Sequence, residues 1–369
     1  MKQAPLARHF VSPPDGMMQA NRTTALRLML ALVIGLAGGA WPAAAPLRAA
    51  SDPLPPLAIQ FTLDRPLDAA AAPFVMAAVG GLFSAEGLSV GTNIATGSAD
   101  AIARVAGGAS DFALVDINAL IRFRDTPGAA PVKAVFVLFN QAPYAIIARK
   151  SRGIRGLSDI QGKTLGVAEG DLSIRLWPAV ARQNGIQLGS VKQNSISAAV
   201  REPMLSAGQV EAVTGFSYLS AINLRDRGVP ADDLAVLRFA DYGCEAYGFA
   251  VIVSPRLAAA KPDAVKGFVR AVIGGTNLTL KDPARATTEV VSRMDGGSAE
   301  LEQERLRAII RDNILTGEVR RNGIGGVDPA RFERSVDQLA EDFKFQKRPH
   351  VTDIFDESFL PPRDDRLIN

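Results

Sequence analysis

The sequence predicts an α/β protein with mainly parallel sheets, arranged as two lobes and completed by a helical C-terminal part. Short apolar runs alternate with helical stretches from residue 57 onward, which is typical of βαβ units. This pattern restarts near residue 143, and only helical patterns follow residue 254. Apolar residues make up 47% of the 369 residues and charged residues 21%, so a wholly disordered chain is excluded.

The first series of elements precedes residue 140. Apolar runs bounded by glycine and polar residues predict its strands, and helical spacing predicts its helices. We expect strands at 57–63, 88–95, 112–115 and 132–139, and helices at 70–83, 99–106 and 117–124.

The second series has the same character and ends in a single return strand. We expect strands at 144–149, 164–168, 191–195 and 212–216, helices at 173–183, 198–207 and 220–227, and the return strand at 247–254. The remaining chain is expected to form helices at 262–280, 283–294, 299–313 and 329–345.

No further βαβ unit follows the return strand, so this strand is expected to rejoin the first sheet. Lobe 1 would then comprise residues 51–142 and 246–369, and lobe 2 would be the inserted residues 143–245. Two crossovers between the lobes would make a hinge, and the cleft between the lobes is the natural ligand site.

Residues 1–50 have the features of a secretory signal peptide. Arg22 and Arg27 precede an apolar stretch at 28–37, which is too short for a comfortable membrane span. Cleavage is expected after Ala49 or Ala50, the alternative being an uncleaved anchor. The true start is expected at Met17 or Met18, with residues 1–16 a misassigned start. No cysteine follows for a lipid anchor, and we expect a periplasmic location.

Charge and residue usage exclude several classes of function. The net charge is +3, but five basic residues lie in the leader, which leaves 36 basic and 37 acidic residues after residue 50. A nucleic-acid partner is therefore not expected. The single cysteine, Cys244, excludes an intrachain disulfide. Of the two histidines only His350 lies beyond the leader, which argues against a histidine-based triad or metal site. We expect no metal, no cofactor and no enzymatic activity.

Several stretches, in order along the chain, resemble the periplasmic substrate-binding proteins of ABC importers for sulfonates, nitrate and thiamine-precursor pyrimidines. They are residues 72–88, 97–98, 108–112, 157–167, 208–212, 242–254 and 353–361. The resemblance implies a two-lobed type II periplasmic binding fold. It further implies a monomeric receptor that delivers a small solute to an ABC permease and ATPase. The alternatives are a ligand sensor that docks on a membrane receptor and, less favoured, an enzyme on the same scaffold.

Candidate ligand residues follow the predicted strands, where open α/β sheets bind ligands. Gly97 and Ser98 precede a helix, so Ser98 is expected as an N-cap beside amides that can hold an anion; a cap without a ligand is the alternative. Asp116 either faces the cleft or simply caps the next helix. Glu169, Asp171 and Ser173 open the first helix of the inserted lobe and are expected to line the cleft from the other side.

The pair Asp64-Arg65 differs from the resembled family, whose pyrimidine binders have Asp-Trp after the first strand. An arginine can stack on a ring or bind a carboxylate, which favours an anionic or heteroaromatic solute; the alternative is that Arg65 turns to solvent. The remaining candidates are Asn140 and, on the return crossover, Tyr242, Glu245 and Tyr247. The tyrosines could instead serve only hinge packing.

Trp177 is the only tryptophan beyond the leader, because the other one is Trp41. It lies early in the predicted helix 173–183, next to Pro178. We expect it near the cleft mouth, where ligand-driven closure would change its emission; the alternative is that it packs inward and reports nothing.

Overall fold

The computed structural model describes residues 55–368. The predicted signal peptide and its cleavage site lie outside these residues. No helix within the described part of the chain combines the length and the apolar character needed to cross a bilayer.

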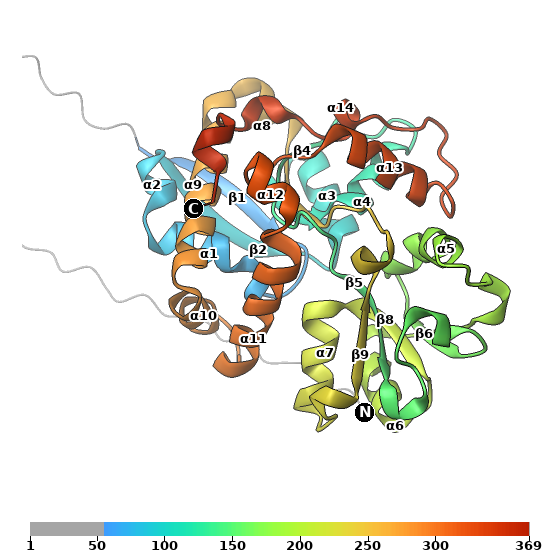
Figure 1. The fold of residues 1–369 in the computed structure, drawn as a ribbon. Coiled ribbons are helices and arrows are strands. Elements are labelled where there is room, and N and C mark those ends of the chain that lie inside the picture. Colours follow the sequence, from blue (N-terminus) through green and yellow to red (C-terminus); the bar gives the residue numbers. More distant parts are fainter. Residues whose placement is uncertain (1–54, 369) are drawn as a thin grey trace, which may run out of the picture. The chain divides into compact units, whose positions relative to one another are not determined.

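The first of two five-stranded sheets has the strand order β2-β1-β3-β10-β4 (Figure 1). β1 runs parallel to β2 and β3, whereas β10 runs antiparallel to both β3 and β4. Every residue of β3 and β10 is buried, as expected for central strands covered on both faces. The strands are β1 (Leu57–Leu63), β2 (Leu88–Ile94), β3 (Phe112–Asp116), β4 (Lys133–Val137) and β10 (Phe249–Val253).

The second sheet has the order β7-β6-β8-β5-β9 and is made only of strands between residues 144 and 238. β6 is parallel to β7 and β8, and β5 is antiparallel to β8 and β9. β9 was not expected from the sequence, because its five residues follow a short turn instead of a helix. The strands are β5 (Tyr144–Arg149), β6 (Thr164–Ala168), β7 (Lys192–Ile196), β8 (Ala212–Phe216) and β9 (Leu234–Arg238).

The predicted helices are found in their expected order, some of them shorter than expected, and three short helices at 255–260, 317–322 and 351–354 were not predicted. The helix expected at 70–83 is broken at Gly81, whose φ of 68° is left-handed and ends the first segment. The helices are α1 (Ala72–Val79), α2 (Leu82–Ala85), α3 (Ser98–Ala106), α4 (Ile117–Arg124), α5 (Ser173–Gln183), α6 (Arg201–Ala207), α7 (Ser217–Asp226), α8 (Pro255–Ala260), α9 (Pro262–Lys281), α10 (Pro283–Val291), α11 (Ala299–Ile309), α12 (Gly317–Asn322), α13 (Pro329–Leu339) and α14 (Val351–Ile354).

The C-terminal helices complete the core of the first sheet. Phe268 of α9 stacks on Phe112 of β3 with ring centroids 4.0 Å apart, and Phe61 and Phe83 also pack against it. α9 approaches α1 so closely that a Cβ on Gly275 would lie 2.1 Å from the Pro73 carbonyl oxygen. Glycine at this position is therefore a packing requirement.

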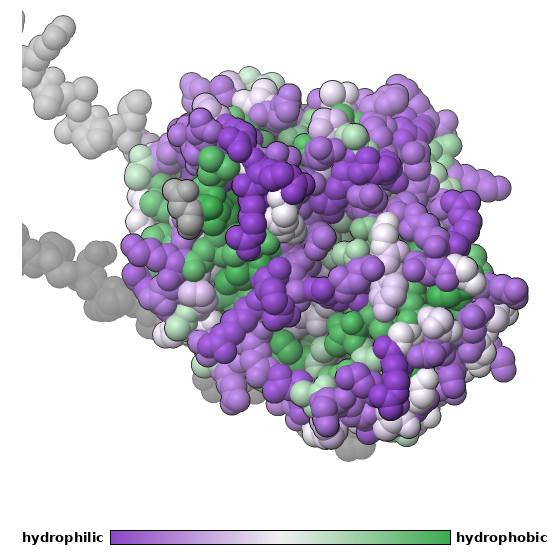
Figure 2. All heavy atoms as spheres, in the orientation of Figure 1, coloured by the Kyte–Doolittle hydropathy of each residue, from purple (hydrophilic) through white to green (hydrophobic). Residues whose placement is uncertain are grey.

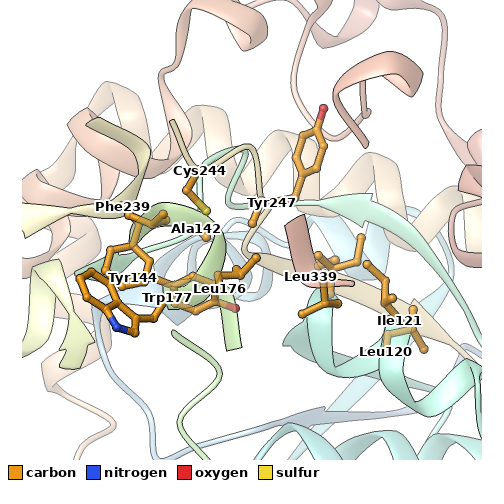
Figure 3. Close-up of a cluster of buried hydrophobic side chains, with 14 of the residues drawn as sticks. Leu120, Ile121, Ala142, Tyr144, Leu176, Trp177, Phe239, Cys244, Tyr247 and Leu339 are labelled. Atoms are coloured by element: carbon orange, nitrogen blue, oxygen red, sulfur yellow. The ribbon is translucent and has the colours of Figure 1, made fainter. Parts of the chain in front are cut away.

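Trp177 packs inward, so the expectation that it lies at a cleft mouth is wrong. Its side chain is 0% exposed, and its ring centroid lies 6.2 Å from that of Phe239. Figure 3 shows it among buried side chains that include Tyr144 and Leu176. The physical reason is that the apolar face of α5 turns toward the second sheet, and the indole lies on that face.

We predict that acrylamide quenches the emission of Trp177 weakly in a folded chain produced without residues 1–50, because the indole has no contact with solvent. Fluorescence titration of folded and urea-unfolded protein checks this, with the unfolded sample as the control for full access. Equal quenching in the two samples would contradict the burial.

Candidate functional site

A cavity of about 880 Å³ is lined by residues from elements of both sheets, and we call it the inter-sheet cavity. On the side of the first sheet, the cavity is lined by the segment after β1, the start of α3, and α4. On the side of the second sheet, it is lined by the loop before α5, the start of α6, and the junction of β8 with α7. Seven predicted residues line it: Asp64, Arg65, Gly97, Ser98, Asp116, Glu169 and Asp171.

Asp64 and Arg65 form a paired group at the carboxyl end of β1. Arg65 donates from Nε to Asp64 Oδ1 at 2.7 Å and from Nη2 to Oδ2 at 2.9 Å. Ser98 Oγ donates to the same Oδ2 at 2.5 Å. The Asp64 carboxylate thus accepts three hydrogen bonds, and Arg65 keeps the two N–H groups of Nη1 and the second N–H of Nη2 outside this pair.

The Arg65 guanidinium lies between two phenylalanine rings that belong to different sheets. Its Cζ is 4.2 Å from the ring centroid of Phe249 and 4.9 Å from that of Phe216. Burial lowers the pKa of Arg65, but the charge and hydrogen bonds of Asp64 more than offset this, and the pKa rises above its ordinary value. Arg65 is therefore a permanent cation, and it does not turn to solvent.

Ser98 does not act as the expected N-cap. Gly97 occupies that position of α3 with a φ of 127°, which a glycine adopts readily. The Ser98 hydroxyl instead donates to Asp64 and accepts from the Asp116 backbone N–H at 3.0 Å. Ser98 therefore joins the ends of β1 and β3.

Asp116 both lines the cavity and caps α4, so the two alternatives from the sequence coexist. Its Oδ1 accepts from the Asn118 backbone N–H at 2.9 Å and from Asn118 Nδ2 at 3.0 Å, and its Oδ2 accepts from the Tyr144 hydroxyl. Burial raises the pKa of Asp116 to about 6, although the bonds from Tyr144 and Asn118 oppose the shift. This carboxyl group changes charge in a mildly acidic solution.

The wall from the second sheet centres on Asp171. Its Oδ1 accepts from Ser173 N at 2.9 Å and Ser173 Oγ at 2.6 Å, and its Oδ2 accepts from Thr214 Oγ1 at 2.6 Å. Ser173 is buried behind Asp171 and does not line the cavity. Arg201, which the sequence did not single out, lines this wall, and its Nη2 lies 3.0 Å from Glu202.

Four predicted residues lie away from the cavity, in the two segments that connect the sheets. They are Asn140, Tyr242, Glu245 and Tyr247. Asn140, Glu245 and Tyr247 contact Arg331 of α13. The Tyr242 carbonyl oxygen accepts from Asn184 Nδ2 at 2.9 Å. None of the four lines the inter-sheet cavity.

Arg331 binds both connecting segments, and we call Arg331 with its partners the hinge cluster. Its Nη2 donates to the Asn140 carbonyl oxygen at 2.8 Å, and its Nε donates to the Glu245 carbonyl oxygen at 2.9 Å. Its Nη1 donates to Glu318 Oε2 at 3.0 Å, and its Cζ lies 4.1 Å from the Tyr247 ring centroid. One side chain therefore fastens both crossovers to the C-terminal helices.

A second cavity of about 810 Å³ lies between α7 and β9 on one side and α11 on the other, and no predicted residue lines it. Apolar side chains gather over α7 and β9 on the face in Figure 2, with hydrophilic side chains around them. Arg225 reaches Glu304 across this cavity at 2.6 Å. The contact joins a helix of the second sheet to one packed on the first.

Residues 68–286 match the sequence profile of the family described as NMT1/THI5 like. The chain belongs to this family. A curated relative, the riboflavin-binding protein RibY of Chloroflexus aurantiacus, is 26% identical over 337 residues, which span 87% of this chain and 91% of the relative. The predicted relation to the sulfonate, nitrate and pyrimidine-precursor binding proteins is confirmed.

Solved structures confirm the predicted fold class. The periplasmic aliphatic sulphonate binding protein SsuA of Escherichia coli aligns with a TM-score of 0.62 at 15% identity, over 79% of this chain and 95% of SsuA. The periplasmic nitrate-binding protein NrtA of Synechocystis aligns with a TM-score of 0.62 at 12% identity, over 82% and 87%. The described residues have the fold of periplasmic solute-binding proteins.

The expectation that the chain is not an enzyme is contradicted by two curated relatives. Both are named 4-amino-5-hydroxymethyl-2-methylpyrimidine phosphate synthase. The Schizosaccharomyces pombe protein is 25% identical over 63% of this chain and 68% of its own length. The Legionella pneumophila protein is 27% identical over 42% of this chain and 49% of its own length. Few histidines and one cysteine were therefore insufficient grounds to exclude an enzyme.

We predict that Arg331→Met lowers the free energy of unfolding by about 3–5 kcal/mol, because it leaves the Glu318 side chain, which is only 12% exposed, without its cation and the carbonyl oxygens of Asn140 and Glu245 without a donor. Urea unfolding measures the change. Arg334→Met is the matched control, since Arg334 is exposed and its effect should stay within about 0.5 kcal/mol. Equal effects of the two substitutions would contradict the role of the hinge cluster.

We predict that the folded protein loses stability as pH rises from about 4 to about 6 because of Asp116. The unfolded carboxyl releases its proton near its ordinary pKa of 3.8, whereas the folded one retains it up to about 6. The folded state binds more protons than the unfolded state in that window. The contribution of Asp116 to the free energy of unfolding therefore falls by about 2–3 kcal/mol as the pH rises through it. Urea unfolding of wild type and Asp116→Asn at pH 4 and pH 7 tests this. A gap between the two proteins that is the same at both pH values would refute it.

Proposed function

We propose that the chain is a solute-binding receptor that captures a small organic molecule in the inter-sheet cavity. The observation that carries this proposal is that residues of both sheets line one cavity. A ligand that touches both walls binds the closed arrangement better than an open one and so favours closure. In this proposal residues 143–245 move as a lobe relative to 51–142 and 246–369, about the two crossovers.

The size and lining of the cavity favour a heteroaromatic solute over a small inorganic ion. A volume of about 880 Å³ falls within the range of about 300–1,000 Å³ for sites that take drug-sized ligands. Apolar side chains, including Phe123, Phe216 and Phe343, contribute much of the lining, and aromatic rings present faces on which a planar ligand can stack. The name of the relative, riboflavin-binding protein RibY, gives a ligand of this kind for that protein.

Delivery of the solute to an ABC permease and ATPase completes the proposal, with the chain acting as a monomer in a periplasm. The fold shared with SsuA and NrtA supports this assignment. A structure from Staphylococcus aureus described as the ligand-binding component of an ABC-type import system aligns with a TM-score of 0.63 at 14% identity, over 82% of this chain and 97% of that one.

A thermal-shift screen followed by calorimetry tests the proposal. Riboflavin, hydroxymethylpyrimidine, aromatic carboxylates, alkanesulfonates and nitrate make up the screen. A ligand at 100 times its Kd adds about 2.7 kcal/mol of stability and raises the Tm by several degrees. We expect one compound class to bind at one site per chain. No stabilisation by any compound would overturn the proposal, and chemical conversion of the bound compound would place the chain with the synthases instead.

We predict that Arg65→Ala weakens binding of the identified solute by about 1.5–3 kcal/mol, because it removes a charged donor and the group held between Phe216 and Phe249. Calorimetry measures the loss. Arg104→Ala is the control, since Arg104 pairs with Asp100 on the outer side of α3 and does not line the cavity. Unchanged affinity in Arg65→Ala would remove Arg65 from the site.

A further inference from the structure

Arg122, in the last turn of α4, differs from the other two arginines that line the inter-sheet cavity. Arg65 is paired with Asp64, and Arg201 is paired with Glu202. Arg122 has no carboxylate partner among the residues that the structure describes, and its buried Nε has no hydrogen-bond partner there. A buried donor without an acceptor costs free energy, so this group is poised to accept an anionic partner.

The neighbouring acids are occupied elsewhere, which explains why Arg122 stays unpaired. Asp125, one turn further along the chain, accepts from the backbone N–H groups of Gln346 and Lys347, at 2.9 and 3.0 Å. Asp342 lies 3.1 Å from Arg175. Burial lowers the pKa of Arg122, the like charge of Arg175 lowers it further, and the charge of Asp342 opposes the shift. The described residues thus place a cation in the cavity wall with no carboxylate at ion-pair distance from it.

The guanidinium of Arg122 also lies beside an aromatic ring. Its Cζ lies 5.1 Å from the ring centroid of Phe343, within the range of a cation–π contact. The Nη groups of an arginine carry N–H donors in the plane of the guanidinium, and such donors bind carboxylates, sulfonates and phosphates. The wall therefore offers a charged N–H donor group beside an aromatic ring.

The acids of the cavity do not cancel this attraction. Asp64, Asp116 and Asp171 each accept three hydrogen bonds from the surrounding protein, which offset much of their charge. Glu169 is exposed, so solvent and salt screen it. Among the described residues, Arg122 is the lining arginine without a carboxylate at ion-pair distance.

We propose that Arg122 binds the anionic group of the solute, so that the ligand class is an aromatic heterocycle bearing a phosphate ester, sulfonate or carboxylate. This inference rests on the proposed function and narrows it. The ring would occupy the apolar, phenylalanine-lined part of the cavity, and the anionic group would lie at the wall formed by α4 and Phe343.

Matched neutral and anionic probes test the inference by calorimetry. One pair is riboflavin and riboflavin 5′-phosphate, and the other is hydroxymethylpyrimidine and its phosphate. We expect the wild-type chain to bind the phosphorylated member of at least one pair about 10- to 100-fold more tightly, as a charged hydrogen-bonded contact would provide. Arg122→Gln should abolish this preference and leave the neutral member unaffected, and Arg122→Lys should keep part of it.

Arg104→Gln is the matched control, because Arg104 has an acidic partner and lies outside the cavity lining; it should retain the full preference. Equal binding of the two members by wild type, or a preference that survives in Arg122→Gln, would overturn this inference while the proposed receptor function stands. If the chain binds neither pair and no compound of the wider screen, the proposed function is overturned, and this inference with it.

Discussion

The guanidinium of Arg331 makes the contacts on which the arrangement of the two sheets depends. The chain passes between the sheets twice, and Arg331 binds a carbonyl oxygen on each passage. Gln338, two turns further along α13, adds a second fastening: it accepts from Glu245 N at 2.8 Å and donates to the Gly243 carbonyl oxygen at 2.7 Å. A helix from the end of the sequence thus fixes where the inserted strands leave and re-enter the first sheet, and thereby where the walls of the inter-sheet cavity stand.

Sequence reasoning located the strands well because their signals are local. The runs Leu57–Leu63 and Thr164–Ala168 were predicted with the bounds that the structure has. β9 was missed, since its five residues directly follow the short turn Ala231–Asp233 and the sequence shows no helical stretch there, and the break at Gly81 was missed because α2 resumes the helical pattern at once. The order of the strands within each sheet depends on long-range pairing, which no local pattern contains.

The cavity lining could be predicted only in part, for a related reason. Asp64 and Asp116 directly follow strands, and the rule that strand ends meet at one sheet edge brings such residues together. Arg122 and Phe343 lie at a helix end and in a C-terminal loop, so their approach is decided by tertiary packing. Asn140 and Tyr247 are also close to strand ends, yet α13 covers them. This helix begins at residue 329, so the sequence around Asn140 and Tyr247 does not indicate that it packs there.

The placement of β10 between β3 and β4 has a consequence for how the chain folds. The second sheet draws all its strands from one continuous stretch, so its contacts have modest separation in sequence. The first sheet lacks a central strand until residues 249–253 have been synthesised. The pairing of this strand with β3 must close a loop of more than a hundred residues. Contacts of such separation form slowly. During synthesis from the N-terminus, the inserted sheet can therefore assemble while β3 still has an open edge, and that edge is the part of the nascent chain most exposed to wrong pairing.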